Sequence, residues 1–448
     1  MMSVNTICSR LLKAYRNFIA SRDGNVAVIF AITLIPVVGM VGAAVDFSHA
    51  NSVKVAMQSA LDATVLKLSK EAGTDTPAQL QTNATSYFQA VFNRPEAQNV
   101  TVTAAYTTSG GTHITLNGSA AVPTYFMGLM GFNSMTVTDT AAATWGTTRL
   151  LAALVLDNTG SMAQSGKIAA EQTASKNLLT QLQSAAHSDG DVYVSVIPFV
   201  DAVNVGASNY TASWLTWADY GTCSRGGGTN ITQQLCKLGG GSWTTYPTSR
   251  QSSWTGCVLD RGDVTGPDVG NYDTNAAPPT LGNAATQFAA VQYSSCPQQS
   301  MGLSYNWSTM TTLINNMTPS GVTNQNIGLA IGWMSLVGGG PYTVPSLDPN
   351  YTYKKAIILL TDGLNNTDRW YNTQSPVDAR QTLTCKNIQA AGITIYTVQV
   401  STDGTPRSTL LETCASDSSK YFYLTSATEI ISTFSSIGTD LSNLYLSQ

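Results

Sequence analysis

The sequence predicts an α/β domain with a doubly wound, mainly parallel sheet, preceded by a transmembrane helix and a small α+β module. Three observations support this prediction. They are an uncharged apolar segment near the N-terminus, a following stretch of alternating Val, Ile and Thr, and a long C-terminal region in which apolar strand patterns alternate with helix patterns. A chain of 448 residues is long enough for two or three such units.

The composition narrows the class of protein. Only 11% of the residues are charged and the net charge is -4, so the chain lacks the basic surface with which proteins bind nucleic acid. Six cysteines follow the apolar segment, none of them in a CxxC pair or near a histidine. This favours three disulfides in an oxidising compartment over a zinc site. The six are Cys223, Cys236, Cys257, Cys296, Cys385 and Cys414.

The apolar segment has the length of a membrane span. Residues 26–45 carry no charged side chain, and about twenty helical residues match the ~30 Å hydrocarbon core of a bilayer. Four basic residues precede the segment, whereas Asp46 follows it. We therefore expect residues 1–25 in the cytoplasm, one transmembrane helix over residues 26–47, and an exported remainder. A cleaved signal peptide is the alternative, but its apolar core has only ~7 to 15 residues.

Residues 48–148 are predicted to form a helix-plus-sheet module of pilin-like composition. The helical pattern of the membrane segment continues to Gly73, and a second helical pattern runs from about Pro77 to Asn93. Three stretches between residues 99 and 145 then alternate Val, Ile, Thr and Tyr with small residues, as antiparallel strands do. We expect this module to be a stalk without an active site.

A loop of oxygen-bearing side chains follows the first strand of the C-terminal domain, residues 149–448. The apolar run LLAALVLD is typical of a buried parallel strand, and the pattern D-x-T-x-S begins at its last residue. The pattern supplies one carboxylate and two hydroxyls, from Asp157, Thr159 and Ser161. Carboxylate and hydroxyl oxygens are hard ligands suited to Mg²⁺, Mn²⁺ or Ca²⁺.

Two later segments bring further oxygens to the same edge of the sheet. The strand pattern AIILLTDG delivers Asp362, and open α/β sheets bind ligands at the carboxyl ends of their strands. Thr323 stands just before a helix pattern between the two strands and can supply another oxygen. We therefore predict a divalent cation at this edge, with Mg²⁺ as the first expectation and Mn²⁺ or Ca²⁺ as alternatives.

A long insertion interrupts the alternation of strands and helices. Residues 203–305 contain four cysteines and many Gly, Ser, Thr and Trp residues, and they are too many for an ordinary loop. We predict an inserted subdomain with two disulfides, whose pairing the sequence leaves open. Its aromatic side chains could line a recognition surface or fill a small core. Cys385 and Cys414 flank one strand, so we expect a disulfide between them, with two buried thiols as the alternative.

The oxygen-bearing segments resemble a known metal site. The D-x-T-x-S loop, the distant threonine and the T-D-G aspartate occur in the order found in the von Willebrand factor A family, whose metal-ion-dependent adhesion site begins D-x-S-x-S. The resemblance implies that Asp157, Thr159 and Ser161 face the ion. It also implies that Thr323 ligates the ion and that Asp362 binds it directly or through water. Thr159 replaces the usual serine and keeps the hydroxyl.

Both ends of the chain carry a second resemblance. Residues 22–64 look like the start of TadG-like proteins of Tad (tight adherence) pilus assembly, which join such an anchor to an exported von Willebrand A domain. Residues 420–447 are similar to the terminal strand and helix of the same family. The resemblance implies a role in assembling or anchoring Flp-type pili at the bacterial inner membrane, with adhesion as the outcome and other pilus-assembly or envelope proteins as partners.

We compared three classes of function. The expected one is metal-dependent protein binding, in which a carboxylate of the partner completes the coordination of the cation. A metal-independent structural scaffold of the envelope is the alternative. A metal-dependent hydrolase has less support, because the sequence has no HExxH, GxSxG or Walker A motif and its three histidines leave few general bases. We therefore expect no enzyme activity and no small-molecule substrate.

Overall fold

The computed structural model divides the chain into two compact units. It describes residue 16 and residues 25–71, 76–107, 112–145, 148–186, 188–225 and 231–446. The first unit contains residues up to Thr144 and the second contains residues from Trp145 onward. Nearly all of the predicted cytoplasmic segment, and the predicted helix end at Gly73, lie outside the described residues.

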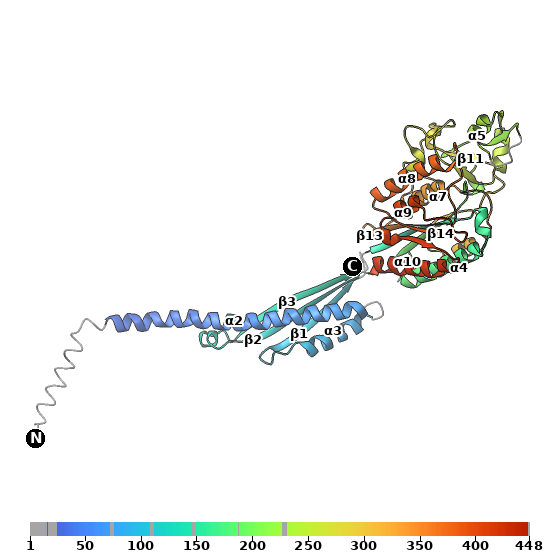
Figure 1. The fold of residues 1–448 in the computed structure, drawn as a ribbon. Helices are drawn as coiled ribbons and strands as arrows, with labels where there is room; N and C mark the ends of the chain where they lie inside the picture. Colours follow the sequence, from blue (N-terminus) through green and yellow to red (C-terminus); the bar gives the residue numbers. More distant parts are fainter. Residues whose placement is uncertain are drawn as a thin grey trace, which may run out of the picture. The chain divides into compact units, whose positions relative to one another are not determined.

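The first unit is a long helix packed on a small sheet (Figure 1). Its helices are α2 (Asn25–Glu71), α3 (Pro77–Val91) and the short η2 (Met127–Met130). Its strands are β1 (Gln98–Thr107), β2 (Thr112–Pro123) and β3 (Ser134–Trp145), in the order β1-β2-β3. β1 and β2 are antiparallel, as predicted. Met57 and Leu61 of α2 are buried against Gly118 of β2, where an added methyl group would lie 3.0 Å from each of them.

The first half of α2 is apolar and exposed. Residues 28–45 carry large hydrophobic side chains on all sides of the helix, and Ile35 and Met40 are each 74% exposed. Among the described residues, α2 is the one helix with the length and hydropathy to cross a membrane. Its apolar half thus differs from its second half, where one face is buried in the unit.

The second unit is built on a ten-stranded mixed sheet. Five strands at its centre and one side, in the order β15-β14-β13-β4-β5, are parallel to one another. They are β4 (Thr148–Asp157), β5 (Val192–Phe199), β13 (Thr352–Thr361), β14 (Thr394–Val400) and β15 (Tyr421–Leu424). The predicted mainly parallel, doubly wound α/β fold is therefore confirmed.

Helices cover both faces of this sheet (Figure 1). One layer contains α7 (Gln325–Val337), α8 (Gln374–Ala390) and α9 (Thr409–Cys414), and the other contains α4 (Lys167–Ala185), α6 (Trp307–Asn315) and α10 (Glu429–Leu446). Successive residues of β4 alternate between the two cores, so that Leu151 packs with one layer and Leu150 with the other. Burial on both faces explains why the central strands are continuous apolar runs.

Five strands within residues 203–305 extend the same sheet, whereas β8 and β9 form a separate two-stranded sheet. β6 pairs antiparallel with β5, and β10, β11 and β7 follow in order, while β12 also pairs antiparallel with β5. The insertion contains β6 (Val203–Asn204), β7 (Leu215–Thr216), β8 (Gly221–Cys223), α5 (Gln233–Leu238), β9 (Trp243–Thr245), β10 (Cys257–Leu259), β11 (Phe288–Val291) and β12 (Met301–Ser304).

Three disulfides and an aromatic cluster stabilise this unit. The bridges join Cys223 to Cys236, Cys257 to Cys296 and Cys385 to Cys414, so the predicted last pair is confirmed. Trp254 is 2% exposed, and its indole N–H lies 2.9 Å from the carbonyl oxygens of both Cys257 and Val291. Trp217 packs edge-on against it with ring centres 5.7 Å apart. These two aromatic side chains therefore pack in a core and do not form a recognition surface.

Candidate metal centre

Two aspartates meet where neighbouring strands end. β4 and β13 are parallel and in register, with Leu156 opposite Leu360, so Asp157 and Asp362 emerge at the same edge of the sheet. Both are buried, with exposed fractions of 0% and 6%. Parallel pairing thus places side by side two carboxylates that are far apart in the sequence.

Hydrogen bonds connect the loop after β4 with the loop after β13. The hydroxyls of Thr159 and Ser161 are 3.0 Å apart, and Ser161 Oγ donates to a carboxylate oxygen of Asp362 at 2.6 Å. Asp157 accepts hydrogen bonds from the Thr159 backbone N–H at 2.8 Å and from the Thr361 hydroxyl at 2.6 Å. Four of the five predicted ligands therefore belong to one continuous network.

The fifth predicted ligand, Thr323, reaches the same edge from the loop before α7. The Gly160 N–H donates to the Gly321 carbonyl at 3.1 Å and holds this loop against the loop after β4. A methyl group added at Gly363 would lie 3.6 Å from the Thr323 hydroxyl and 3.9 Å from the Ser161 hydroxyl. Because glycine has no side chain there, the two hydroxyls face a common space.

The donor set fits a hard divalent cation. It combines two carboxylates with three hydroxyls, and hard cations favour oxygen ligands of these kinds. Among the described residues, no group of three or more His, Cys, Asp or Glu could hold a metal ion, so the hydroxyls would be essential ligands. Ser161 is exposed whereas Asp157, Thr159, Thr323 and Asp362 are buried, and the centre therefore opens to solvent at Ser161. That these residues bind an ion stays a prediction.

Two charged residues of α4 belong to the centre and were missed by the sequence analysis. The Lys167 ammonium forms an ion pair with Asp362, and Lys167 is only 4% exposed. Glu171, four residues later on the same helix, is completely buried. The available signal was this pair of charges at i and i+4, which lies on one face of a helix directly after the D-x-T-x-S loop.

The electrostatics of the centre favour an additional positive charge. Burial, together with the negative charge of Asp362, raises the pKa of Asp157 to about 6. Burial also raises the pKa of Glu171 well above its usual range, and the charges of Asp157 and Asp362 raise it further. Of these three carboxylates, only that of Asp362 forms an ion pair with Lys167 among the described residues. A cation here would favour their ionised forms.

The insertion braces the loops that carry Thr323 and Asp362. The side-chain amide of Asn324, the residue after Thr323, donates to the buried Asp260 carboxylate at 2.7 Å. Arg369, in the loop after β13, is 1% exposed and pairs with Asp219 of the insertion at 2.9 Å. These buried contacts connect the loops of the candidate metal centre to the insertion.

Comparisons with family models match both parts of the chain. Residues 24–66 match the Flp pilus-assembly TadE/G-like family, and residues 273–436 match the von Willebrand factor type A domain. The chain joins a TadE/G-like N-terminal region to a von Willebrand factor A domain. This combination is consistent with a TadG-like pilus-assembly protein. The von Willebrand A match includes Thr323 and Asp362 but begins after the D-x-T-x-S loop.

Several solved structures are similar at low identity. The pilus adhesin SpaC from Lactobacillus rhamnosus GG has 14% identity and a TM-score of 0.37, and the match covers 79% of this chain but only 35% of that chain. The vWF domain of the type V pili tip protein Mfa5 from Porphyromonas gingivalis has 8% identity and a TM-score of 0.37, covering 67% of this chain and 97% of that chain. The adhesive tip pilin GBS104 from Group B Streptococcus agalactiae has 10% identity and a TM-score of 0.33, covering 66% and 100%. No curated protein matches the chain.

Proposed function

We propose that this protein is a single-pass inner-membrane component of a Tad pilus system that binds a partner protein through a divalent cation. In this proposal the N-terminus is cytoplasmic, α2 crosses the membrane, and the von Willebrand A domain lies outside the cytoplasm. The apolar first half of α2 and the three disulfides support this orientation. The TadE/G-like region links the chain to pilus assembly.

The observation that carries the proposal is the convergence of oxygen donors at one edge of the sheet. Asp157 and Asp362 come from two parallel strands, and the hydroxyls of Thr159, Ser161 and Thr323 lie beside them. These five side chains would hold Mg²⁺, or alternatively Mn²⁺ or Ca²⁺. When bound, the cation supplies a Lewis-acidic position that a carboxylate of the partner can fill.

The residues of this chain have distinct roles in such a site. The Thr361 hydroxyl and the Thr159 N–H orient the Asp157 carboxylate by the two hydrogen bonds that it accepts. Gly363 keeps the space between the Ser161 and Thr323 hydroxyls free of a side chain. The exposed Ser161 marks the side from which a partner can approach.

Binding without catalysis is part of the proposal. A hydrolase would need a general base beside the cation, and an imidazole is the commonest one. The two described histidines, His49 and His113, belong to the first unit. Lys167, which pairs with Asp362, and Glu171, whose pKa the charges of Asp157 and Asp362 raise, are both buried in α4. This arrangement favours a recognition site over an enzyme and its small-molecule substrate.

Calorimetry on the full-length protein in detergent tests the metal site. We expect Mg²⁺ and Mn²⁺ to bind the wild type and to show no measurable binding to the double variant Asp157→Ala, Asp362→Ala. Glu412→Ala, which removes an exposed carboxylate of α9, is the matched control and should bind like the wild type. Equal cation affinities in the wild type and the double variant would overturn the proposal.

A metal-independent scaffold is the second candidate, and one observation favours it. The Lys167 ammonium already gives Asp362 a positive partner from within the chain. If that ion pair is permanent, the domain would bind its envelope partners through other surfaces. Capture of pilus-assembly proteins from membranes, unchanged by a chelator and by the double variant, would select this candidate.

A further inference from the structure

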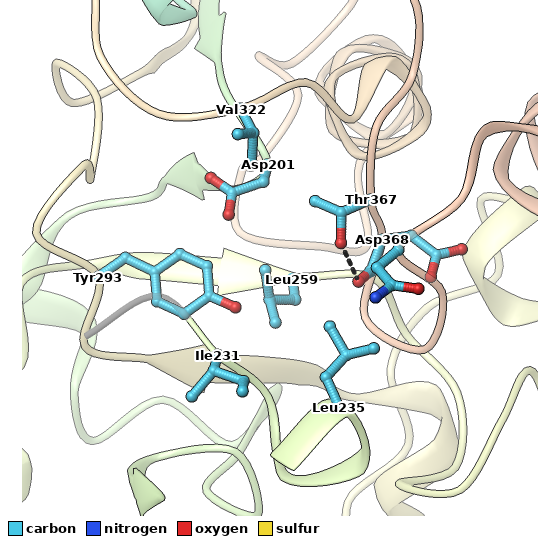
Figure 2. A pocket seen from close by; sticks show the side chains of 9 residues that line it. Asp201, Ile231, Leu235, Leu259, Tyr293, Val322, Thr367 and Asp368 are labelled. Atoms are coloured by element: carbon cyan, nitrogen blue, oxygen red, sulfur yellow. Dashed lines mark hydrogen bonds between the residues drawn. The ribbon is translucent and has the colours of Figure 1, made fainter. Parts of the chain in front are cut away.

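A cavity of about 370 Å³ lies next to the candidate metal centre. Val322, which directly precedes Thr323, lines it, and so does Thr367, whose backbone N–H donates to the Thr323 carbonyl at 3.4 Å. The opposite wall comes from the insertion (Figure 2). The cavity has room for several water molecules. We call it the Asp201 cavity, after the carboxylate that faces it.

Asp201 is a buried carboxylate with unused hydrogen-bonding capacity. It follows β5 and is 4% exposed, and its Oδ1 atom has no hydrogen-bond partner among the described residues. Burial raises its pKa to about 7. Two arginines of this region, the buried Arg369 and the partly buried Arg380, have other partners, since Arg369 pairs with Asp219 and Arg380 with Asp273. Burying an ionised carboxylate without a positive partner or hydrogen-bond donors costs free energy. A cation from outside the chain would therefore stabilise the ionised form of Asp201.

Apolar and aromatic side chains form most of the remaining wall. Figure 2 shows the Asp201 carboxylate and the Tyr293 ring on the same side of the cavity, with Leu259 beside the ring. Tyr293 and Leu259 are 5% and 1% exposed. A carboxylate beside an aromatic ring suits an organic cation, and an apolar wall suits an aliphatic stem. A divalent metal ion would instead need about six oxygen ligands.

A second carboxylate adds to the negative potential of this cavity. Asp368 lines it, and its Oδ1 atom accepts hydrogen bonds from the backbone N–H groups of Trp370 at 2.7 Å and Tyr371 at 2.6 Å. Its Oδ2 atom has no hydrogen-bond partner within the part of the chain that the structure describes. Both carboxylates therefore favour a positively charged occupant.

We propose that the Asp201 cavity binds a lysine or arginine side chain of a partner protein. The cationic head would pair with Asp201, and the aliphatic stem would lie along Leu259 and Tyr293. This site is distinct from the metal centre and does not require a metal. Because the two sites share the loop at Val322 and Thr323, a partner segment with one basic and one acidic residue could occupy both.

The test uses peptide probes on the full-length protein at pH 8, where Asp201 is ionised, in the presence of a chelator. Acetylated pentapeptide amides with a central lysine, arginine or norleucine, flanked by glycines, are titrated and followed by NMR. We expect the lysine and arginine peptides to bind at least about tenfold more tightly than the norleucine peptide, because norleucine keeps the stem and lacks the charge.

Asp201→Asn should remove this preference without changing Mg²⁺ binding, which serves as the check on folding. The double variant Asp157→Ala, Asp362→Ala should keep the preference, so a failure of the metal site is distinguished from a failure of the cavity. Equal binding of all three peptides, no binding of any of them, or a preference that survives in Asp201→Asn would each overturn the inference.

An apolar loop in the first unit supports a second, independent inference. Residues 124–132 connect β2 to β3 and expose large apolar side chains that no described residue covers. The exposed fractions are 87% for Leu129, 67% for Tyr125, 61% for Phe132 and 55% for Met130. Contiguous exposed apolar side chains mark a surface that contacts a protein or a membrane.

This loop is fixed against the apolar half of α2. The Asp46 carboxylate accepts hydrogen bonds from the backbone N–H groups of Tyr125 and Phe126 at 2.9 Å each and of Met127 at 2.7 Å. Phe126 lies so close to Gly42 that a methyl group there would be 2.5 Å from the Phe126 side chain. A groove of about 420 Å³ separates the loop from α2 near Gly39.

We infer that the loop enters the outer half of the membrane beside α2 and that a lipid acyl chain fills the groove. The inference rests on the membrane anchor of the proposed function. Gly39 and Gly42 lie within the uncharged segment, so a helix that crosses the bilayer there carries the attached loop into the hydrocarbon. The exposed side chains of the loop are apolar, as insertion requires.

Lipid quenching tests the position of the loop. Leu129→Cys in a Cys8→Ser background is labelled with an environment-sensitive dye and reconstituted into vesicles that contain nitroxide-labelled phosphatidylcholine. Leu238→Cys, a 69% exposed position of the second unit, is the control. We expect quenching at position 129 and none at position 238. If the protein floats with the vesicles but position 129 is not quenched, only the inference about the loop is overturned. If the protein does not float with the vesicles, the membrane anchor is overturned as well.

Discussion

Lys167 and Asp362, 195 residues apart in the sequence, form a buried ion pair at the carboxyl edge of the sheet. Asp362 is also a predicted metal ligand, so the ammonium and a cation compete for the same carboxylate. Lys167 begins α4, and Asp362 follows β13. The pair therefore connects the ligand loop to the helix that covers it.

Replacing Lys167 by methionine separates the two effects of this ion pair. Without the ammonium, we expect Mg²⁺ affinity to rise by about tenfold or more, because no charge within the chain competes with the cation. In a chelator, the free energy of unfolding should fall by about 3 kcal/mol, because the Asp362 carboxylate stays buried without its partner. Lys386→Met, at an exposed position of α8, is the control. Weaker Mg²⁺ binding by Lys167→Met would show that the lysine assists the site.

Substitutions of Thr159 test the role of its hydroxyl, at the position where the D-x-S-x-S motif has serine. Thr159→Ser keeps the oxygen donor, so we expect its Mg²⁺ affinity to stay within about threefold of the wild type. Thr159→Val keeps the shape and removes the donor, and we expect affinity to fall by about tenfold or more. Titration calorimetry measures both. If the valine variant binds as well as the serine variant, the Thr159 hydroxyl takes no part in the site.

The raised pKa of Asp201 predicts a stability difference that depends on pH. Its pKa is about 7 in the folded protein against 3.8 in the unfolded chain, so folding favours the protonated form. Below about pH 3 the group is neutral in both states, so its burial lowers stability by nothing. As pH rises from about 4 to 7, the unfolded chain releases the proton first, and the wild type loses about 2 to 4 kcal/mol of stability.

Asp201→Asn should therefore match the wild type at pH 3 and be more stable at pH 8, by about 2 to 4 kcal/mol. Urea unfolding at both pH values measures the difference. Asp368, which lines the same cavity and has a pKa raised to about 6, titrates in both proteins, so its effect largely cancels. Tyr293 does not interfere, because burial raises its pKa well above 10. A difference that does not depend on pH would contradict the assignment.

Much of the candidate metal centre could be predicted because local patterns place its residues at strand ends. The apolar runs before Asp157 and Asp362 are long enough to identify buried parallel strands, and parallel pairing brings their ends together. Thr323 was found from its place before the helix pattern of α7. Hydrophobic periodicity in the sequence therefore identifies all three segments that meet at the candidate site.

The remaining features depend on contacts that no local pattern encodes. The Lys167 ion pair and the burial of Glu171 follow from how α4 lies over the two strand ends. The insertion supplies four of the nine residues that line the Asp201 cavity, and within it β6 has two residues and β10 has three. Strands this short show no alternation, so their place in the sheet comes from tertiary pairing, of β6 with β5 and of β10 with β6.

The Cys385–Cys414 disulfide should contribute strongly to the stability of the von Willebrand A domain. It joins α8 to α9 across a sequence separation of 29 residues, and both sulfur-bearing side chains are buried in one core. Closing a loop of this length in the unfolded chain corresponds to about 3 to 4 kcal/mol, so Cys385→Ala, Cys414→Ala should lower the free energy of unfolding by about that amount. Urea unfolding without reductant measures the loss. Mg²⁺ binding should stay unchanged, because neither cysteine touches the donor set. Equal stability of the variant and the wild type without reductant would mean that the bridge does not form in the protein.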